Sequence, residues 1–248
     1  MSDHFNGDRF FNPAGTNGRP FSAVPKMIAE KRAPWPESVP VELRLPAPLE
    51  PRAWAAITFV GHSTFLIQTR RGHILTDPMF SERASPLRFI GPRRVRRAAV
   101  AIADLPPIAM VLLSHNHYDH CDLASLRALR RRFDPLLVTP LNNARLARRA
   151  GFRRIEEVDW WEPAGRGPLR VTASPAQHFS ARTPFDRNRA LWAGFVIDVD
   201  GRRIFFAGDT GYGDHFRQVR DRLGPIDVAL LPIGAYEPRW FMKDVHMD

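Results

Sequence analysis

A run of seven residues, Ser114–His120, concentrates side chains that bind metal ions. It reads Ser-His-Asn-His-Tyr-Asp-His and holds three of the nine histidines of the chain. Imidazole and carboxylate groups suit Zn²⁺, and also iron and manganese. An isolated histidine is usually a core or surface residue, whereas clustered histidine and aspartate residues are typical of a metal site.

The spacing within this run favours two metal ions rather than one. His115 and His117 are two residues apart, so in an extended loop their side chains point the same way and can share one ion. Asp119 and His120 follow as the chain turns, and can reach a second ion. A binuclear site can hold both an attacking hydroxide and a leaving oxygen.

Two further candidate ligands follow predicted strands elsewhere in the chain. His178 ends the sequence Ser-Pro-Ala-Gln-His, and Asp209 lies in Ala-Gly-Asp-Thr-Gly-Tyr. Strands are rigid elements, so a side chain that directly follows a strand can be held accurately in position. The two oxygens of Asp209 could bridge two ions, although this residue could instead cap a turn beside Gly208 and Gly211.

Short strands and amphipathic helices would position these ligands. Met110–Leu113 is wholly apolar, which predicts a buried strand directly before the metal-binding run. Asp122 predicts the N-cap of a helix with Leu123, Leu126 and Leu129 on one stripe. The other predicted elements are strands at Ile57–Val60, Thr64–Gln68, His73–Thr76, Leu169–Ala173, Leu191–Val199, Arg202–Ala207 and Asp227–Ile233, and a helix at Asn142–Ala150 ended by Gly151. The pattern predicts an α/β protein with two sheets covered by helices.

Length and composition exclude several classes of protein. The 248 residues are 44% hydrophobic and 25% charged, which is ordinary for a globular protein that can bury a core. Cys121 is the only cysteine, so an internal disulfide framework and a cysteine-rich zinc cluster are excluded. There is no apolar stretch of roughly 18 residues and no secretory signal pattern. We expect a cytoplasmic protein, with peripheral attachment to a membrane left open.

Residues 1–53 differ in composition from residues 54–248, which carry the candidate ligands. Nine of the 23 prolines lie between Pro13 and Pro51. This predicts an extended N-terminal arm that wraps the domain or is only partly ordered. We expect His4 in a mobile terminus, and His73 and His215 on the surface.

The formal charge of +10 comes almost entirely from arginine, and such a chain attracts anions. Phosphates, anionic lipid surfaces and nucleic acid are all candidate partners. Basic residues interleaved with aromatic ones, which would favour nucleic acid, are not evident. An arginine-rich surface without a specific partner explains the charge equally well.

The three ligand sequences, in this order and at these gaps, resemble the metallo-β-lactamase superfamily. Longer sequences resemble its N-acylphosphatidylethanolamine-hydrolysing phospholipase D branch, from residue 54 to the end and more weakly at Phe10–Pro13. They lie at Thr76–Pro86, Gly91–Arg94, Asp159–Glu162 and Pro232–Met242. The resemblance implies an αββα sandwich with two zinc ions at one edge of the sheets.

The resemblance also implies a role for each ligand. His115, His117 and His178 would hold one zinc ion, while Asp119 and His120 would hold the other. Asp209 would bridge the two ions and, with Asp119 and His120, form the catalytic set. A bridging hydroxide would attack the phosphodiester, which implies release of an N-acylethanolamine and a phosphatidic acid. Members of the branch are often homodimers.

One departure from the family concerns the second zinc ion. The family has a further histidine ligand some tens of residues beyond His246, followed by its last strands and helix, and this chain has no histidine after His246. We therefore expect either a C-terminally incomplete domain or an incomplete second site, in which His246 could substitute. A non-catalytic relative with a degenerate site is a further alternative, as is a lactonase or a nucleic-acid phosphodiesterase.

Other residues are candidates for substrate contact or for support of the ligands. His62 could line the site or hold a turn, and Tyr118 and Asn116 could orient groups around the ions. The basic cluster that includes Arg93 and Arg94 could contact an anionic phospholipid surface, although a solvated loop is equally consistent with it. Cys121 is expected to be a small buried side chain.

Overall fold

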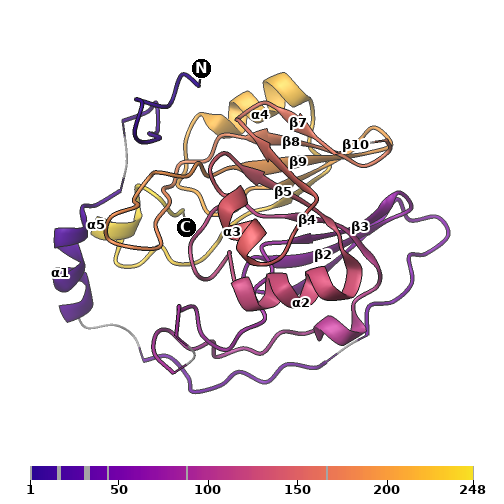
Figure 1. Ribbon diagram of the computed structural model, residues 1–248, viewed down its shortest axis with the longest axis horizontal. Coiled ribbons are helices and arrows are strands. Elements are labelled where there is room, and N and C mark those ends of the chain that lie inside the picture. Colours follow the sequence, from indigo (N-terminus) through magenta and orange to yellow (C-terminus); the bar gives the residue numbers. More distant parts are fainter. Residues whose placement is uncertain are drawn as a thin grey trace.

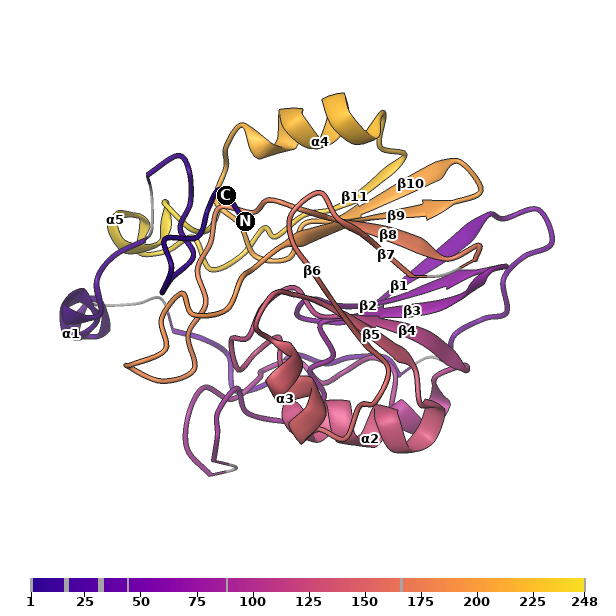
Figure 2. The ribbon, with the colours of Figure 1, turned by 45° about the horizontal axis from the view of Figure 1, so that its top comes forward.

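The computed structural model describes residues 2–15, 18–30, 34–43, 45–87, 89–165 and 167–247. Two β-sheets pack face to face, and helices cover the outer face of each (Figure 1). The rotated view shows the four layers edge-on, with α4 over one sheet and α2 and α3 under the other (Figure 2). The predicted αββα sandwich is confirmed.

The first sheet has the strand order β1-β2-β3-β4-β5-β6. Its first three strands pair antiparallel, and β3 to β6 run parallel to one another. The strands are β1 Ala55–Gly61, β2 Thr64–Thr69, β3 Gly72–Thr76, β4 Ile108–Leu112, β5 Leu136–Pro140 and β6 Ile155–Val158. The apolar strand predicted before the metal-binding run is therefore β4, inside the sheet, and its carboxyl end delivers that run.

The second sheet has the order β11-β10-β9-β8-β7. All its pairs are antiparallel except β10 with β11. The strands are β7 Pro163–Ala164, β8 Arg170–Ser174, β9 Gly194–Val199, β10 Arg202–Phe206 and β11 Val228–Leu230. The strand predicted from Leu191 begins only at Gly194, because the main chain before it binds loops instead, as where Ala193 N donates to Ser114 O at 3.0 Å.

Helix α2 (Leu123–Phe133) begins as predicted. The side chain of Asp122 accepts a hydrogen bond from Ala124 N, and Leu126 and Leu129 are buried. Helix α3 (Ala144–Arg149) is followed by Gly151 with a positive φ of 93°. Three further α-helices of the described chain were not predicted, namely α1 (Val24–Ala29), α4 (His215–Leu223) and α5 (Arg239–Met242).

The main core lies between the two sheets and includes one residue of the N-terminal arm. Trp192, Phe195 and Phe206 are its largest fully buried side chains, and Phe10 packs into the same cluster. After Phe10 the arm forms α1 and then runs along the outside of the first sheet and its helices to reach β1 (Figure 1). Residues before β1 therefore help to form the core of the domain.

Two histidines lie elsewhere than predicted. His4 is buried, not in a mobile terminus: its ring stacks on Trp160 at 3.8 Å, and its Nε2 lies 2.9 Å from Asp159 Oδ1. His215 is buried at the start of α4 rather than exposed, because its Nε2 bonds to Thr210 Oγ1 at 3.1 Å. His73 is half-buried in β3.

Over the part of the chain that the structure describes, no helix combines the length and the apolar character needed to cross a membrane.

Candidate metal centre

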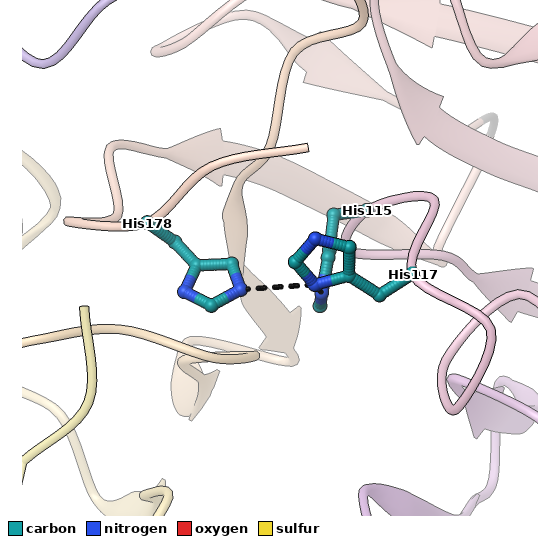
Figure 3. Close-up of side chains that lie close together, drawn as sticks. All are labelled: His115, His117 and His178. Atoms are coloured by element: carbon teal, nitrogen blue, oxygen red, sulfur yellow. Dashed lines mark hydrogen bonds between the residues drawn. The ribbon is translucent and has the colours of Figure 1, made fainter. Parts of the chain in front are cut away.

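Three histidines from two loops converge at one edge of the sheets. His115 and His117 follow β4, and His178 follows β8 (Figure 3). His117 Nδ1 lies 2.9 Å from His115 Nε2 and 3.2 Å from His178 Nε2. This is the set that the sequence analysis assigned to one ion, and the structure brings its ring nitrogens together.

A second group lies beside the first and shares a carboxylate with it. His120 Nε2 is 3.1 Å from Asp209 Oδ2 and 3.7 Å from Asp119 Oδ2. The same Asp209 oxygen is 4.0 Å from His178 Nε2, in the first group. Asp209 therefore lies between the two groups, which is the placement that a bridging carboxylate requires.

Burial keeps the histidines of the first group uncharged. It lowers the pKa of His117 to about 4 and holds the pKa of His115 and His178 well below the usual value. An uncharged imidazole has a lone pair on one nitrogen, which is the form that binds metal. These three side chains can therefore all act as ligands at neutral pH.

The second group has the opposite electrostatic character. Burial opposes the charge on His120, but Asp209, Asp119 and Asp77 outweigh it and raise the pKa of His120 well above the usual value. Burial likewise opposes the charge on Asp119 and Asp209, but His120 outweighs it, and the pKa of each carboxyl group is lowered. Negative charge concentrated here suits a bound cation.

The donor set fits a divalent cation. His120 Nε2 and His246 Nδ1 are buried, and neither forms a hydrogen bond with any described residue, although carboxylate oxygens lie nearby. Groups of three or more possible ligand atoms lie within 4.8 Å of one another, in overlapping sets around the cluster. Nitrogen and carboxylate donors of this kind are the usual ligands of Zn²⁺.

Asp77 supports this cluster, and the sequence analysis did not assign it a role. Its Oδ2 lies 2.7 Å from His120 Nδ1, and its Oδ1 accepts a hydrogen bond from Ser114 N at 2.7 Å. A signal was available, because Asp77 directly follows the strand predicted at His73–Thr76. Parallel neighbouring strands end at the same sheet edge, so residues after β3 and β4 meet there.

His62 and His246 flank the cluster. His62 Nε2 lies 3.0 Å from Asp119 Oδ2, and its half-exposed ring faces the cavity described below. His246 Nδ1 lies 4.0 Å from Asp209 Oδ2, and its ring centroid is 5.2 Å from that of His178. The structure thus places near the ligands both histidines that the sequence analysis could not assign firmly.

Tyr118 and Asn116 belong to the wall beside the ligands. The Tyr118 hydroxyl donates to Arg182 O at 3.2 Å, and the Arg182 guanidinium lies 3.9 Å from the centroid of that ring. Arg182 Nη1 also donates to Asn116 O and to Cys121 O, which holds the metal-binding run in place. Cys121 is fully buried as predicted, and burial raises the pKa of its thiol to about 12.

Arg93 and Arg94 of the basic cluster make contacts within their own loop. Arg93 is exposed, and its Nε is 3.9 Å from Glu82. Arg94 is half-buried, donates to Met79 O at 2.7 Å, and has a pKa lowered by burial. Neither side chain lines the cavity at the cluster. Arg94 therefore holds a loop together, and only Arg93 of this pair is free to face solvent.

A cavity of about 1130 Å³ opens over the ligand cluster. His62, His117, Asp119, Asp209 and His246 form its polar floor, and Arg19, Arg182 and Arg187 contribute positive charge. Most of the remaining wall is apolar, from Val24, Met27, Trp35, Phe59, Phe65, Phe179, Phe206, Leu230, Leu231, Ile233, Phe241, Met242 and Val245. Its volume is above the range of roughly 300–1,000 Å³ for ordinary small-molecule sites.

Comparison with known families identifies the class of protein that this fold and cluster define. The model of the beta-lactamase superfamily domain matches residues 72–248, so the chain belongs to that superfamily. A UPF0173 metal-dependent hydrolase of Opitutus terrae is 32% identical over 186 residues, which are 73% of each chain. The chain is thus a metal-dependent hydrolase by family, and a divalent metal is its expected cofactor.

Among the curated relatives are two N-acyl-phosphatidylethanolamine-hydrolyzing phospholipases D. The Caenorhabditis elegans protein is 34% identical over 203 residues, covering 77% of this chain and 57% of that protein. The mitochondrial protein of Saccharomyces cerevisiae is 34% identical over 198 residues, covering 77% and 42%. The chain thus spans about half the length of these relatives.

Solved structures with the same fold include enzymes of different chemistry. An isothiocyanate hydrolase from Delia radicum gut bacteria is 26% identical with a TM-score of 0.57, covering 72% of this chain and 71% of that one. A diiron β-hydroxylase from Streptomyces venezuelae is 25% identical with a TM-score of 0.55, covering 80% and 38%. The fold therefore does not determine the reaction.

Proposed function

We propose that the chain is a zinc-dependent phosphodiesterase that hydrolyses N-acylphosphatidylethanolamine to an N-acylethanolamine and phosphatidic acid. The observation that carries this proposal is the position of the ligand cluster, on the floor of a large and mainly apolar cavity. A substrate with a phosphodiester and long acyl chains matches both the ligand cluster and the apolar wall. The similarity to the two phospholipases D supports the same substrate class.

In this proposal the chain holds two zinc ions. One belongs to His115, His117 and His178, and the other to Asp119 and His120, with Asp209 between them. When bound, the ions would activate water and neutralise negative charge on the phosphodiester. His246, 4.0 Å from Asp209, offers a further nitrogen at the second position.

The residues around the ligands would bind and orient the lipid. The apolar wall would take the acyl chains, since each buried CH₂ group contributes about 0.8 kcal/mol. The three arginines that line the cavity would favour an anionic phosphate group. His62, with its ring half-exposed beside Asp119, is placed to donate a hydrogen bond to a substrate or product oxygen.

An anionic membrane surface is the proposed source of this substrate. In the loop before β4, Leu87, Phe89 and Ile90 are exposed, and so are Arg93 and Arg97. Apolar side chains beside exposed cations suit the boundary between acyl chains and anionic headgroups, where each cation contributes about 1 kcal/mol. Arg94 is left out of this surface because its guanidinium is half-buried.

The deciding experiment supplies the zinc-loaded chain with N-acylphosphatidylethanolamine in mixed micelles and measures both products by mass spectrometry. Bis(p-nitrophenyl) phosphate, an N-acyl homoserine lactone and a single-stranded oligonucleotide serve as competing substrate classes. We expect the largest kcat/KM on the lipid and two zinc ions per chain by elemental analysis. Faster turnover of the lactone or the oligonucleotide would overturn the proposal.

A further inference from the structure

The N-terminal segment of residues 4–12 is docked against the loop that carries His178. Phe10 N donates to Asn188 O at 2.8 Å, and Phe10 itself is buried in the main core. Arg9 Nη1 donates to Arg187 O in the same loop. At its start the segment is anchored by His4, stacked on Trp160. The segment is therefore tied to the domain at both ends.

Asn12 connects this segment to the metal ligand itself. It is 2% exposed, and its Nδ2 donates to the main-chain carbonyl of His178 at 2.8 Å. A buried hydrogen bond of this kind is costly to lose, because the carbonyl is then left unsatisfied. The bond thus fixes the backbone from which the His178 ring projects.

The ring of His178 is fixed from the other side by the C-terminal segment. His178 Nδ1 lies 3.0 Å from Val245 O. A carbonyl only accepts hydrogen bonds, so Nδ1 carries the proton and the lone pair of Nε2 faces His117. Gly18 of the arm packs on Val245, since a Cβ added there would lie 3.0 Å from Val245 Cγ1. The arm thus contacts the main chain of His178 directly, through Asn12, and its ring indirectly, through Val245.

We propose that Asn12 is a positioning residue for His178, and that residues 4–12 are therefore a working part of the metal centre rather than an appendage. This rests on the proposed function only in assigning His178 to the metal. Substitution of a residue that positions a metal ligand typically lowers metal affinity by about 10- to 100-fold.

The test compares Asn12→Leu, which keeps the branched shape of the side chain but removes the amide, with Gln68→Met. Gln68 is a matched control because it is also buried and its Nε2 donates to Ala47 O at 3.1 Å, which ties a different part of the arm to β2. Asn12→Ala serves as a second variant if the leucine does not pack. Folding of each variant is verified by circular dichroism and thermal unfolding.

Hydrogen–deuterium exchange of the metal-free chain is the first readout. We expect the amides of residues 176–181 to exchange at least about tenfold faster in Asn12→Leu and Asn12→Ala, and at the parental rate in Gln68→Met. The second readout is the dissociation constant for Co²⁺, with its visible absorption spectrum. We expect it to rise at least about tenfold in the Asn12 variants and to change less than twofold in Gln68→Met.

Parental exchange in residues 176–181 of the folded Asn12 variants would overturn the inference. So would faster exchange of these residues in Gln68→Met to the same degree, or an unchanged Co²⁺ spectrum and affinity in the Asn12 variants. The exchange readout needs no metal. If the parent itself bound no Co²⁺ or Zn²⁺, the proposed function would fail, and the exchange rates would still decide the role of Asn12.

Discussion

His120 Nδ1 lies 2.7 Å from Asp77 Oδ2, and both side chains are fully buried. This contact sets the direction of the His120 ring, with Nε2 turned toward Asp209 and Asp119. A carboxylate only accepts hydrogen bonds, so His120 Nδ1 carries a proton. Asp77 thereby directs the other nitrogen of His120 to the position expected for the second ion.

Asp77→Asn tests this relationship. The amide can turn its NH₂ group toward His120 Nδ1, which favours the tautomer with a proton on Nε2 and removes the lone pair for the metal. We expect zinc affinity to fall by about 10- to 100-fold, measured by competition with a chromophoric chelator. Asp134→Asn is the control, because Asp134 is an exposed helix C-cap. Affinity within twofold of the parent would refute the role of Asp77.

Asp119→Ala and His178→Ala each remove one ligand from a different group of the cluster. If both groups hold metal, either loss removes several kcal/mol of transition-state stabilisation, and we expect kcat/KM on the lipid to fall at least about a thousandfold. Elemental analysis of each purified variant should show fewer than two zinc ions per chain. Full activity in either variant would contradict the assignment of that residue.

Ile233→Ser tests the apolar wall of the cavity. Ile233 lines the cavity and is 81% exposed in the absence of lipid. Loss of its contacts with an acyl chain should lower kcat/KM for the long-chain lipid by about tenfold, with bis(p-nitrophenyl) phosphate unaffected. Leu43→Ser is the control, because Leu43 is also exposed but lies outside the cavity. Equal losses on both substrates would exclude a role for this wall in binding acyl chains.

The double substitution of Arg93 and Arg97 by glutamine tests the proposed membrane surface. Removal of two exposed cations should weaken binding to phosphatidylserine vesicles by about 2 kcal/mol, or roughly 30-fold, in a sedimentation assay at low salt. Arg127 and Arg131, exposed on α2, supply a control pair of the same charge. If substitution of either pair weakens vesicle binding equally, the attraction of the chain to the vesicle depends on net charge and not on this loop.

Acid should destabilise the chain through His215. Burial lowers the pKa of His215 to about 4, against 6.5 for the ordinary side chain, although Asp214 opposes the shift. Between these values the unfolded chain binds more protons than the folded chain. The contribution of His215 to stability is therefore fully present above pH 6.5, and it falls by up to about 1.4 kcal/mol for each unit by which the pH drops. Below about pH 4 this contribution is lost completely.

His215→Gln removes this titration and isolates it from other groups. Urea unfolding of the metal-free parent between pH 7.5 and 5 should show up to about 2 kcal/mol more loss of stability than the variant shows. The difference between the two chains matters here, because the ligand histidines titrate in both. A difference that is the same at both pH values would show that His215 does not contribute.

The sequence predicted the parts of the fold that depend on local pattern. Asp122 and the leucine stripe after it predicted α2, and the Asp200-Gly201 turn between β9 and β10 has positive φ at both residues, as such a hairpin requires. Helix α4 was missed although Phe216, Val219 and Leu223 follow one another at helical spacing. These three side chains pack together with Val196 and Phe205 of the second sheet, and the many polar and basic residues between them hid the stripe.

The ligand cluster was more predictable than its surroundings. His115 and His117 are close in the sequence, and His178 and Asp209 follow strands, so their types and positions could be read directly. Asp77 also follows a predicted strand, so the same signal was available for it, whereas Asn12 has no such pattern. Each acts on a ligand through a contact that only the folded chain brings about, His120 in one case and the His178 carbonyl in the other.

The candidate metal ligands come from both sheets, and this links metal binding to the folding stability of the chain. His115 to His120 follow β4 in the first sheet, whereas His178 and Asp209 follow β8 and β10 in the second. An ion held by both sets binds only the docked sheets, so at 100 times its dissociation constant it adds about 2.7 kcal/mol to their stability. Chelation would then stop turnover and also lower the stability of the docked sheets, so resistance to proteolysis would rise and fall with the zinc supply.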